Sequence, residues 1–546
     1  MTESCAQLFR RSSLSALSRR AFLSGTAAAA TGITLAGTAV ATATPGGSTP
    51  RRRTPVVREE HRVIVIGSGF GGGIAALRLA QAGVPVLLLE RGKRWATGPN
   101  ADTFGNPMNP DKRLLWHGSD PRIFGKPVAL EPYTGLLDAV VGENMTALCA
   151  AGLGGGSLLY QGMSLQPAEA VFNTHFPQEL DWRLMDRVHY PRVAAMLQLA
   201  VAPDELIAHP HYKAARIFAR NAAAAGLPVS KIPMPIDWNY ALAETRGEMK
   251  ASYSNGAGAF GVNNGGKHSV DVTYVAAAEA TGLVDVRVMH NVTDVERGPD
   301  GRWLVHVDRT DESAQVLEKK ILTTGALIMA AGSLNTTELL MRAAGKGLIP
   351  DMPDGLGAGW GTNADRIYTW TNLAEDFGAE QGGPVVYGSL NWDDPATAHT
   401  VIQASIPPLG MDAHTTMLVG YGVSEARGRF VYDSAADSAR LSWPADGDAA
   451  IQYGRIEKTV HKVAGPAAIV GDTNRAFPST WHPLGGACMG AVCDLEGRVH
   501  DQPGLYVLDG ALLPGNAAAC NPSMTIAAVA ERALDELVAH DVGTAI

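Results

Sequence analysis

The clearest pattern in the chain is an apolar strand followed by a glycine-rich turn, a helix and a second strand. Residues 61–66 are mostly β-branched and apolar, which predicts a buried strand, and five of the seven residues in 67–73 are glycines. Apolar residues at helical spacing in 74–80 predict a helix. The apolar run 84–89 predicts a second strand, which ends at Glu90. This order of elements predicts a parallel βαβ unit.

Later segments continue the same domain. Residues 286–289 and 303–307 alternate like strands on either side of the turn signal at 298–301. The apolar run 326–332 ends in glycine and predicts another buried strand, after which Ser333 is expected to cap a helix.

The C-terminal section repeats the strand-then-glycine arrangement at 504–510. A helix is predicted from Pro522 to Ala539, starting near Asn521. The positive end of its dipole would favour a negatively charged group.

Two long inserts interrupt these segments. Residues 164–268 are Ala-rich and helical in pattern, whereas 366–474 are more strand-like. We therefore expect an α/β protein with an interleaved α+β substrate domain, built from the two inserts on a mixed β-sheet. The Rossmann-like nucleotide-binding domain is expected to comprise 61–163, 269–365 and 475–546.

The N-terminal segment has the composition of an export signal. Arg19 and Arg20 precede an apolar stretch over 21–40, and small residues follow to position 43. The paired arginines indicate twin-arginine export, so residues 1–43 are predicted to be a Tat signal and the protein to be secreted or associated with the cell envelope. The alternative is an uncleaved anchor. Glycine, proline and consecutive arginines predict a flexible linker over 44–60.

The composition indicates a globular protein with one large domain or two interleaved ones. With 546 residues, 46% of them hydrophobic, the chain can bury a sizeable core, and a formal net charge of −9 offers no basic surface to nucleic acid. The five cysteines form no CxxC motif, so we expect no metal site and no disulfide framework. Cys488 and Cys493 are close enough in sequence to form one incidental disulfide.

The glycine-rich turn has the spacing of a dinucleotide-binding fingerprint. Gly67, Gly69 and Gly72 follow the G-x-G-x-x-G pattern, which brings a pyrophosphate to the N-terminus of a helix. Glu90 stands 23 residues after Gly67, where an acid can bind the ribose hydroxyls. FAD and NAD share this fingerprint. Export favours FAD, because a soluble nicotinamide would be lost outside the cell whereas a tightly held flavin would travel with the folded protein.

Two motifs near the C-terminus carry the candidate chemistry. His482 lies in Trp-His-Pro-Leu-Gly-Gly, and Asn521 begins Asn-Pro-Ser-Met-Thr 39 residues later. A single His before Pro is more often a structural turn residue, but the pairing resembles the signature of the glucose–methanol–choline (GMC) flavin oxidoreductases. Further segments resemble the noncovalent-FAD cholesterol oxidases of actinobacteria: 109–113, 154–158, 331–334, 337–340, 357–361 and 427–433. The resemblance extends from about residue 60 to 542.

This resemblance implies that His482 and Asn521 bracket a reacting hydroxyl near the flavin. Imidazole, with an ordinary pKa of about 6.5, can accept the hydroxyl proton near neutral pH. The implied reaction oxidises a 3β-hydroxysteroid to the ketone and reduces O2 to H2O2. Asp412 stands where the family has a glutamate that moves the steroid double bond. Because Asp is one methylene shorter, Δ5 to Δ4 isomerisation stays open, and Asp412 is alternatively a solvated loop acid.

The resemblance also implies the residues that contact FAD. Glu90 would hold the ribose, the segment Gly154–Ser157 would pass the isoalloxazine, and the backbone of Val292 would contact adenine. Tyr160 and Gln161 differ from their counterparts in relatives, so the substrate is expected to be held differently. The complete set of expected cofactor contacts is Gly67, Gly69, Phe70, Gly71, Gly72, Glu90, Gly154, Gly155, Gly156, Ser157, Val292, Asp509, Gly510, Asn521 and Pro522.

Two other functions remain open at the level of sequence. One is an FAD enzyme for another bulky alcohol or with an acceptor other than oxygen, and the other is a flavin-retaining sterol-binding protein with little turnover. The expected partners are a sterol and O2, with transient contact to a membrane surface to extract the sterol. The protein is expected to be a monomer.

Overall fold

The computed structural model describes residues 56–100, 102–105, 110–120, 122–123, 126–127, 129–406 and 413–546. The predicted Tat signal, the linker through residue 55 and Asp412 lie outside these residues.

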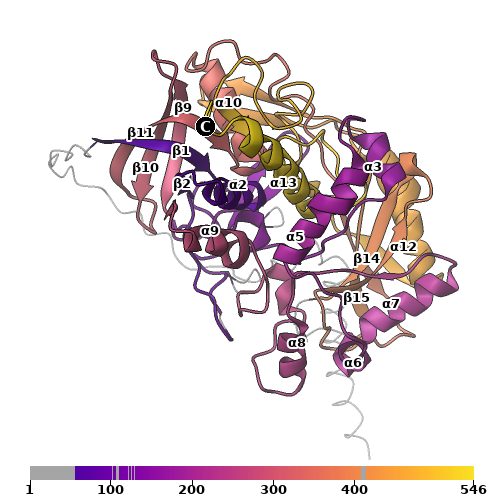
Figure 1. Ribbon diagram of the computed structural model, residues 1–546. Coiled ribbons are helices and arrows are strands. Elements are labelled where there is room, and N and C mark those ends of the chain that lie inside the picture. Colours follow the sequence, from indigo (N-terminus) through magenta and orange to yellow (C-terminus); the bar gives the residue numbers. More distant parts are fainter. Residues whose placement is uncertain are drawn as a thin grey trace, which may run out of the picture.

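Two β-sheets frame the described chain, one on the left and one on the right in Figure 1. The 7-stranded sheet has the order β8-β2-β1-β11-β10-β9, with β20 also paired to β11. Strands β8, β2, β1, β11 and β20 pair in parallel, and β11, β10 and β9 pair in antiparallel fashion. The bounds are β1 Val56–Ile66, β2 Val86–Leu89, β8 Val284–Arg287, β9 His290–Arg297, β10 Trp303–Thr310, β11 Val316–Met329 and β20 Leu505–Val507. This is the predicted nucleotide-binding sheet.

Strand β1 includes the last five residues of the predicted linker, 56–60. Residues 56–60 pair with β11 in continuous parallel register, so the linker prediction was wrong for them. Charge misled the prediction here, because Glu59 is neutralised inside the sheet by Lys320 at 2.7 Å and by Arg287 at 2.6 Å.

The turn at 298–301 joins β9 to β10, so the predicted strand 303–307 is confirmed as part of β10, but 286–289 is not its hairpin partner. Residues 286–289 instead overlap the end of β8, which pairs in parallel with β2. Strand β9 escaped prediction because its sequence, which includes Asn291 and Asp294, is mostly polar at positions that are only partly buried.

The helix after β11, α10 (Gly332–Gly345), begins one residue before Ser333. Its N-cap residue is Ala331, so the predicted capping role of Ser333 was wrong. The Ser333 hydroxyl instead donates to the carbonyl oxygen of Gly485 at 2.8 Å, and this bond fastens α10 to the loop that follows His482.

The 6-stranded sheet of the second domain has the order β18-β12-β15-β14-β13-β7. We expected a mixed sheet, but its described pairings are all antiparallel; the parallel pairings belong mainly to the larger sheet. The bounds are β7 Ser230–Lys231, β12 Arg366–Thr371, β13 Val385–Asn391, β14 His399–Ala404, β15 Thr415–Gly422 and β18 Ile469–Asp472.

The two faces of this sheet bury different cores. One face packs against α7 (Lys213–Ala224) and α12 (Glu457–Ala464) around Trp370 and Leu418. The opposite face presents Ile402, Val419 and Tyr421, which pack with buried residues from elsewhere in the chain, including Cys520, the neighbour of Asn521.

Helices fill the space between the sheets. In Figure 1, α2 (Phe70–Gln81), α13 (Ser523–His540) and α5 (Tyr190–Met196) stand between the two sheets. The other α-helices are α3 Glu169–His175, α4 Trp182–Leu184, α6 Asp204–Ala208, α8 Trp238–Thr245, α9 Ala276–Ala280 and α11 Ala449–Ile451. The 3₁₀ and π segments are η1 Gly155–Ser157, η2 Met185–His189, η3 Pro210–Tyr212, η4 Ala257–Phe260, η5 Asp271–Val275, η6 Pro395–Thr397 and η7 Gln452–Ile456.

Short strands complete the structure. They are β3 Arg122–Ile123, β4 Lys126–Pro127, β5 Leu137–Val141, β6 Thr146–Ala150, β16 Arg429–Asp433, β17 Ser438–Ser442 and β19 Ser479–Thr480. Strand β19 pairs in parallel with β6 and leads directly into the His482 loop.

The described cysteines, Cys149, Cys488, Cys493 and Cys520, are all free thiols. The disulfide considered between Cys488 and Cys493 is therefore absent, because the Cys488 sulfur points toward the carbonyl oxygens of Ala358 and Gly359. Within the described ranges, no group of three or more His, Cys, Asp or Glu side chains is placed to hold a metal ion. No helix in the described part of the chain is both long enough and apolar enough to cross a membrane.

Candidate active site

The glycines of the first loop, residues 67–73, differ in role: some allow the backbone to pack closely, and one leaves space for a ligand. At Gly67, Gly71 and Gly72 an added Cβ would lie 2.3, 1.5 and 1.9 Å from backbone oxygens of the chain. These glycines are therefore required for the close packing of β1, α2 and the segment after β20. Gly67 also has a φ of 97°, which disfavours any residue with a Cβ.

Gly69 and Gly156 are different because they face open space. An added Cβ at Gly69 would be 4.0 Å from its nearest neighbour, the Gly155 Cα, and at Gly156 it would meet nothing within 4 Å. Gly69 is the N-cap of α2 and no side chain caps this helix end. The two loops thus form an open cradle in front of unpaired N–H groups, which fits the pyrophosphate of a dinucleotide.

Ser68 joins the two glycine loops to Glu90. Its hydroxyl donates to Glu90 Oε2 at 2.6 Å and accepts from the Gly154 N–H at 3.1 Å, while Glu90 Oε1 accepts from the Gly92 N–H at 2.8 Å. Burial raises the pKa of Glu90, and these hydrogen bonds oppose that rise. Glu90 is therefore fixed at the end of β2, where a ribose would lie. Sequence reasoning missed Ser68, although it stands inside the fingerprint.

The second glycine loop forms η1 and is held by two buried side chains. The Ser157 hydroxyl donates to the Gly154 carbonyl at 2.7 Å and accepts from the Val270 N–H at 2.9 Å. Lys267, which sequence reasoning also missed, donates to the carbonyl oxygens of Leu158 at 2.9 Å and Tyr160 at 2.6 Å. Burial lowers the pKa of Lys267 to about 7.

The aromatic rings of Phe70 and Tyr160 contact each other and connect the first glycine loop to the segment after the second. Their rings meet edge to face with centroids 5.8 Å apart. The Tyr160 hydroxyl is buried without a hydrogen-bond partner in the described structure, and burial raises the pKa of Tyr160.

Val292 lies on β9, two residues after His290, whose N–H donates to the Glu90 carbonyl at 2.9 Å. The pairing of β9 with β10 shifts register immediately after Val292, between His306 and Val307 on the partner strand. Val292 therefore lies two residues along β9 from this contact with Glu90, and its contact with adenine stays a prediction.

Asp509 and Gly510 close the cradle from the C-terminal section. Asp509 accepts hydrogen bonds from the Gly332 N–H at 2.8 Å, the Thr336 hydroxyl at 2.6 Å and the Ala511 N–H at 2.7 Å. Burial raises the pKa of Asp509 to about 6, against the effect of these bonds. The Gly485 N–H donates to the Gly510 carbonyl at 2.8 Å, so the His482 loop lies against the cradle.

His482 is held from one side by a buried carboxylate that sequence reasoning did not identify. Its Nδ1 lies 2.7 Å from Asp365 Oδ1, and the Asp365 side chain is 0% exposed. The second oxygen of Asp365 accepts from the Thr480 hydroxyl at 2.6 Å. Asp365 is 117 residues away in sequence and follows the quoted segment 357–361 closely, but nothing in its local pattern indicates a contact with His482.

Asn521 is fixed at the start of α13, next to the N-cap residue Pro522. Its Nδ2 donates to the Met163 carbonyl and, at 2.7 Å, to the Ser523 hydroxyl, and its Oδ1 accepts from the Leu165 N–H at 3.1 Å. Its carboxamide is thus oriented by three bonds.

Asn363 joins the His482 and Asn521 segments. Its Nδ2 lies 2.7 Å from the carbonyl oxygen of Cys520 and 3.4 Å from His482 Nδ1. The structure therefore brings together the two motifs that the sequence analysis paired.

Apolar and aromatic side chains surround this polar pair. The Tyr421 ring lies 6.0 Å from the His482 ring between centroids, and the Trp481 ring lies 5.7 Å from it. The Tyr421 hydroxyl reaches the Met163 sulfur at 3.8 Å. Together with the inner face of the 6-stranded sheet, these residues form an apolar wall beside His482.

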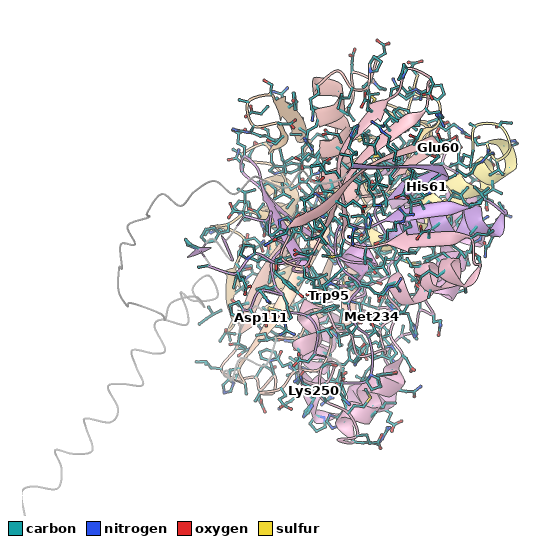
Figure 2. All side chains as sticks on the ribbon, turned by 90° about the vertical axis from the view of Figure 1, so that its left-hand side faces the viewer. Glu60, His61, Trp95, Asp111, Met234 and Lys250 are labelled. Atoms are coloured by element: carbon teal, nitrogen blue, oxygen red, sulfur yellow. The ribbon has the colours of Figure 1, made fainter. Side chains whose placement is uncertain are left out.

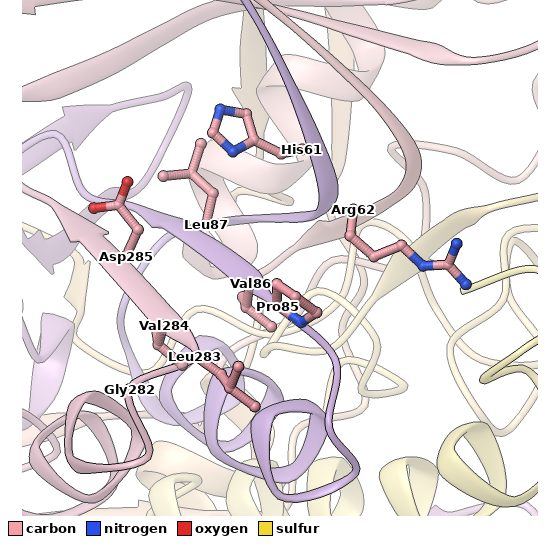
Figure 3. Close-up of a pocket in the computed structure, with 9 residues that line it drawn as sticks. All are labelled: His61, Arg62, Pro85, Val86, Leu87, Gly282, Leu283, Val284 and Asp285. Atoms are coloured by element: carbon pink, nitrogen blue, oxygen red, sulfur yellow. The ribbon is translucent and has the colours of Figure 1, made fainter.

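A separate pocket of about 270 Å³ lies against strands β1, β2 and β8 of the nucleotide sheet. Figure 3 shows it lined by residues of β1, β2 and β8, among them His61, Pro85 and Asp285. Pro85 and Val284 stand at the amino-terminal ends of their strands, whereas nucleotides bind at the carboxyl ends of parallel strands. His61, which lines this pocket, lies with Glu60 in the upper part of the molecule in Figure 2, whereas Met234 and Lys250 of the first insert lie in the lower part.

A dinucleotide cradle at the carboxyl ends of parallel strands, next to a buried imidazole and a carboxamide, defines a nucleotide-dependent oxidoreductase. Models of the GMC oxidoreductase family match residues 130–348 and 432–530, and a model of the FAD binding domain matches residues 62–114. The chain belongs to the GMC oxidoreductase family, a family of alcohol oxidases and dehydrogenases, and its cofactor is FAD. The predicted family and cofactor are thus confirmed.

Known proteins similar to this chain agree with that assignment. A cholesterol oxidase of Mycobacterium tuberculosis is 26% identical, covering 87% of this chain and 91% of its own length. A cholesterol oxidase of Acinetobacter baumannii is 25% identical, covering 88% and 95%. The crystal structure of pyridoxine 4-oxidase from Mesorbium loti has a TM-score of 0.60 at 15% identity, covering 88% of this chain and 99% of that one, which shows the shared fold.

Proposed function

We propose that this protein oxidises the hydroxyl group of a 3β-hydroxysteroid to a ketone and passes the electrons to O2, which becomes H2O2. The observation that carries the proposal is the buried His482 beside Asn521, adjoining a cradle that fits FAD. The similarity to two cholesterol oxidases over most of the chain supports the steroid as substrate.

The residues of the chain would divide the chemistry as follows. When bound, FAD would supply the acceptor for the hydride that leaves the carbinol carbon. Gly69, Gly156 and Glu90 hold the dinucleotide, since the two glycines leave space and Glu90 is fixed at the ribose position.

His482 receives the hydroxyl proton at Nε2, because its Nδ1 is engaged by Asp365. Asn521 holds the substrate oxygen in place without adding charge. The hydroxyl has one proton, which His482 Nε2 takes, so Asn521 would act on the substrate oxygen through its Nδ2 amide, which here donates to the Met163 carbonyl and the Ser523 hydroxyl.

The apolar wall supports a bulky substrate. Tyr421 and Trp481 flank His482, the Met163 sulfur contacts the Tyr421 hydroxyl, and the same apolar cluster includes Ile402 and Val419 of the second sheet. Fused apolar rings would be removed from water on such a surface, at about 25 cal/mol per Å² of apolar area buried.

A substrate panel tests the proposal. The FAD-loaded protein would be mixed anaerobically with cholesterol in detergent micelles, with pyridoxine and with benzyl alcohol, and bleaching of the flavin would be followed. We expect cholesterol to bleach the flavin fastest and, in air, to yield H2O2. Faster bleaching by another alcohol would show that the preferred substrate is not a steroid. Bleaching without H2O2 in air would show that the electron acceptor is not O2. No bleaching with any alcohol would contradict the proposed function.

Isomerisation, export and membrane contact are also proposals. The same reaction with cholesterol reports isomerisation, because a conjugated enone absorbs in the ultraviolet and an unconjugated ketone does not. Replacing Asp412 with Asn is expected to change only the ratio of the two ketones.

The other proposals have separate tests. The intact mass of the protein from the culture medium would test cleavage of the signal near residue 43. Light scattering would test whether the protein is a monomer, and sedimentation with sterol-containing vesicles would test the membrane contact.

A further inference from the structure

Asp365 is a buried carboxylate with a donor at each oxygen. Oδ1 lies 2.7 Å from His482 Nδ1, and Oδ2 accepts from the Thr480 hydroxyl at 2.6 Å and from the Trp481 N–H at 3.3 Å. The Thr480 oxygen also accepts from the His482 N–H at 3.1 Å. Together these hydrogen bonds hold the Asp365 carboxylate and the His482 imidazole in one relative orientation.

We propose that Asp365 is a positioning residue that fixes the tautomer of His482 and stabilises the charge this histidine gains in the reaction. Because the carboxylate accepts only, Nδ1 must carry the proton, and Nε2 is left with the lone pair that takes the proton of the alcohol. In the oxidation the O–H bond breaks and an Nε2–H bond forms, while the carbinol hydrogen leaves with its bonding electrons as a hydride, which bound FAD would accept, and the C=O bond forms. The imidazolium so produced lies beside a carboxylate. This inference rests on the proposed alcohol oxidation.

Asn363 is the competing partner of His482 Nδ1. If its amide donated to Nδ1, the proton would reside on Nε2 and His482 could not act as the base. Its Nδ2 is 3.4 Å from Nδ1, however, and already donates to the Cys520 carbonyl at 2.7 Å. A charge-assisted bond is roughly twice as strong as a neutral one, so the Asp365 contact at 2.7 Å decides the tautomer.

Replacing the carboxylate with an amide tests the proposal. We expect Asp365→Asn to keep its FAD and to slow anaerobic flavin reduction by ~10²–10⁴-fold, the usual contribution of a general base. The probe is the alcohol of the panel above that bleaches the parent fastest. The concentration that half-saturates the reduction should change little, because Asp365 is 2% exposed and lies behind His482, away from the proposed substrate side. Asp365→Glu, which restores the charge, should recover part of the rate.

Asp448 supplies the matched control. It is also buried, accepts from the Thr362 hydroxyl at 2.6 Å and the Ser424 hydroxyl at 2.8 Å, and lines the same small cavity as Asp365. Asp448→Asn makes the same chemical change nearby without a described contact to His482. Its reduction rate should stay within a few-fold of the parent.

A second readout does not depend on turnover. In FAD-loaded protein labelled with 15N-histidine, a histidine Nδ1–H bonded to a carboxylate gives a strongly downfield proton resonance, assigned here by its loss in His482→Ala. We expect this resonance in the parent and in Asp448→Asn, and not in Asp365→Asn. A resonance that persists in Asp365→Asn, or a reduction rate there within a few-fold of the parent, would overturn the proposal.

Thr480→Val keeps the inference testable if Asp365→Asn does not fold. Loss of this hydroxyl loosens the carboxylate without removing it, so the proton resonance should shift and the rate should fall by a smaller factor. An unshifted resonance with an unchanged rate would contradict the proposal. If the parent itself reduces no flavin with any alcohol, the proposed function fails, whereas the resonance still decides whether Asp365 sets the tautomer.

Discussion

At the residue scale, burial changes the charge of Lys267, the cation that holds the second glycine loop. Its side chain is inside the protein and contacts carbonyl oxygens, and its pKa falls to about 7 from the ordinary value of 10.5. Between pH 7 and 10.5 the unfolded chain therefore binds more protons at this position than the folded chain. By linkage, the cost of burying this lysine is greatest below pH 7 and is relieved as the pH rises.

Lys267→Met removes this pH dependence while keeping a side chain of similar length. We expect the unfolding free energy of the parent, relative to Lys267→Met, to rise by about 2 kcal/mol between pH 7 and pH 9. Urea unfolding of the FAD-loaded proteins at both pH values measures the difference. A difference that stays constant with pH would show that Lys267 is not a buried titrating group.

His482 and Asn521 are expected to act on the substrate more than on the fold. The prediction is that His482→Ala and Asn521→Ala retain yellow FAD but reduce the flavin ~10²–10⁴-fold more slowly with the preferred alcohol. Stopped-flow absorbance of the flavin gives the rate, and the visible spectrum gives the FAD content. A variant that reduces flavin at the parent rate would remove that residue from the active site.

At the scale of elements, the start of α2 combines a packing contact with an open cradle. Gly71 touches the backbone after β20, where an added Cβ would lie 1.5 Å from the Leu508 oxygen. Gly69, two residues earlier at the N-cap, has φ −69° and ψ −163°, which other residues adopt, and it faces the cradle.

Alanine at these two positions should therefore impair different properties, stability at Gly71 and FAD binding at Gly69. Gly71→Ala is expected to lower the unfolding free energy by about 1–3 kcal/mol or more, because α2 must move away from β20. Gly69→Ala is expected to fold normally and to bind FAD more weakly, because the added methyl enters the dinucleotide space. Thermal unfolding and fluorescence titration with FAD separate the two effects, and a Gly69→Ala variant with parental FAD affinity would argue against the cradle.

At the scale of the whole molecule, buried charges join the helices between the two sheets. Glu531 on α13 is 2% exposed and pairs with Arg78 of α2 at 2.5 Å and with Arg192 of α5 at 3.0 Å. Asp535, one turn further along α13, contacts the same two arginines. Helix α2 begins at the first glycine loop, and α13 begins directly after Asn521 and Pro522. The ion pairs between these helices therefore connect the dinucleotide cradle to the segment that carries the proposed catalytic residue Asn521.

Breaking this network should destabilise the whole protein. Glu531→Gln removes one of the two carboxylates that Arg78 and Arg192 share, while Asp535 still faces both, so we expect a loss of about 1–3 kcal/mol in the unfolding free energy. Glu248→Gln, at an exposed pair with Arg246, is the control and should have no measurable effect. Urea unfolding compares the two. Equal stabilities would show that the negative charge of Glu531 contributes no net stability.

The sequence predicted best where the signal is local. The strand-turn-helix-strand unit up to Glu90 was found because apolar periodicity and the glycine spacing lie within one stretch of chain. Where a residue takes its role from distant neighbours, the local pattern misled: residues 56–60 look like a charged linker but pair with β11, and Ser333 looks like a helix cap but bonds to Gly485.

By itself, the sequence determined the nucleotide fingerprint, the order of the main elements, and the family and cofactor, together with the pair His482 and Asn521. These are written in short motifs whose physical meaning needs only near neighbours. Only the tertiary structure decided that Asp365 holds His482, that Ser68 couples Glu90 to the second glycine loop, and that Lys267 lies beneath this loop. Such contacts join residues far apart in the chain, and the burial that makes them strong exists only once the chain has folded.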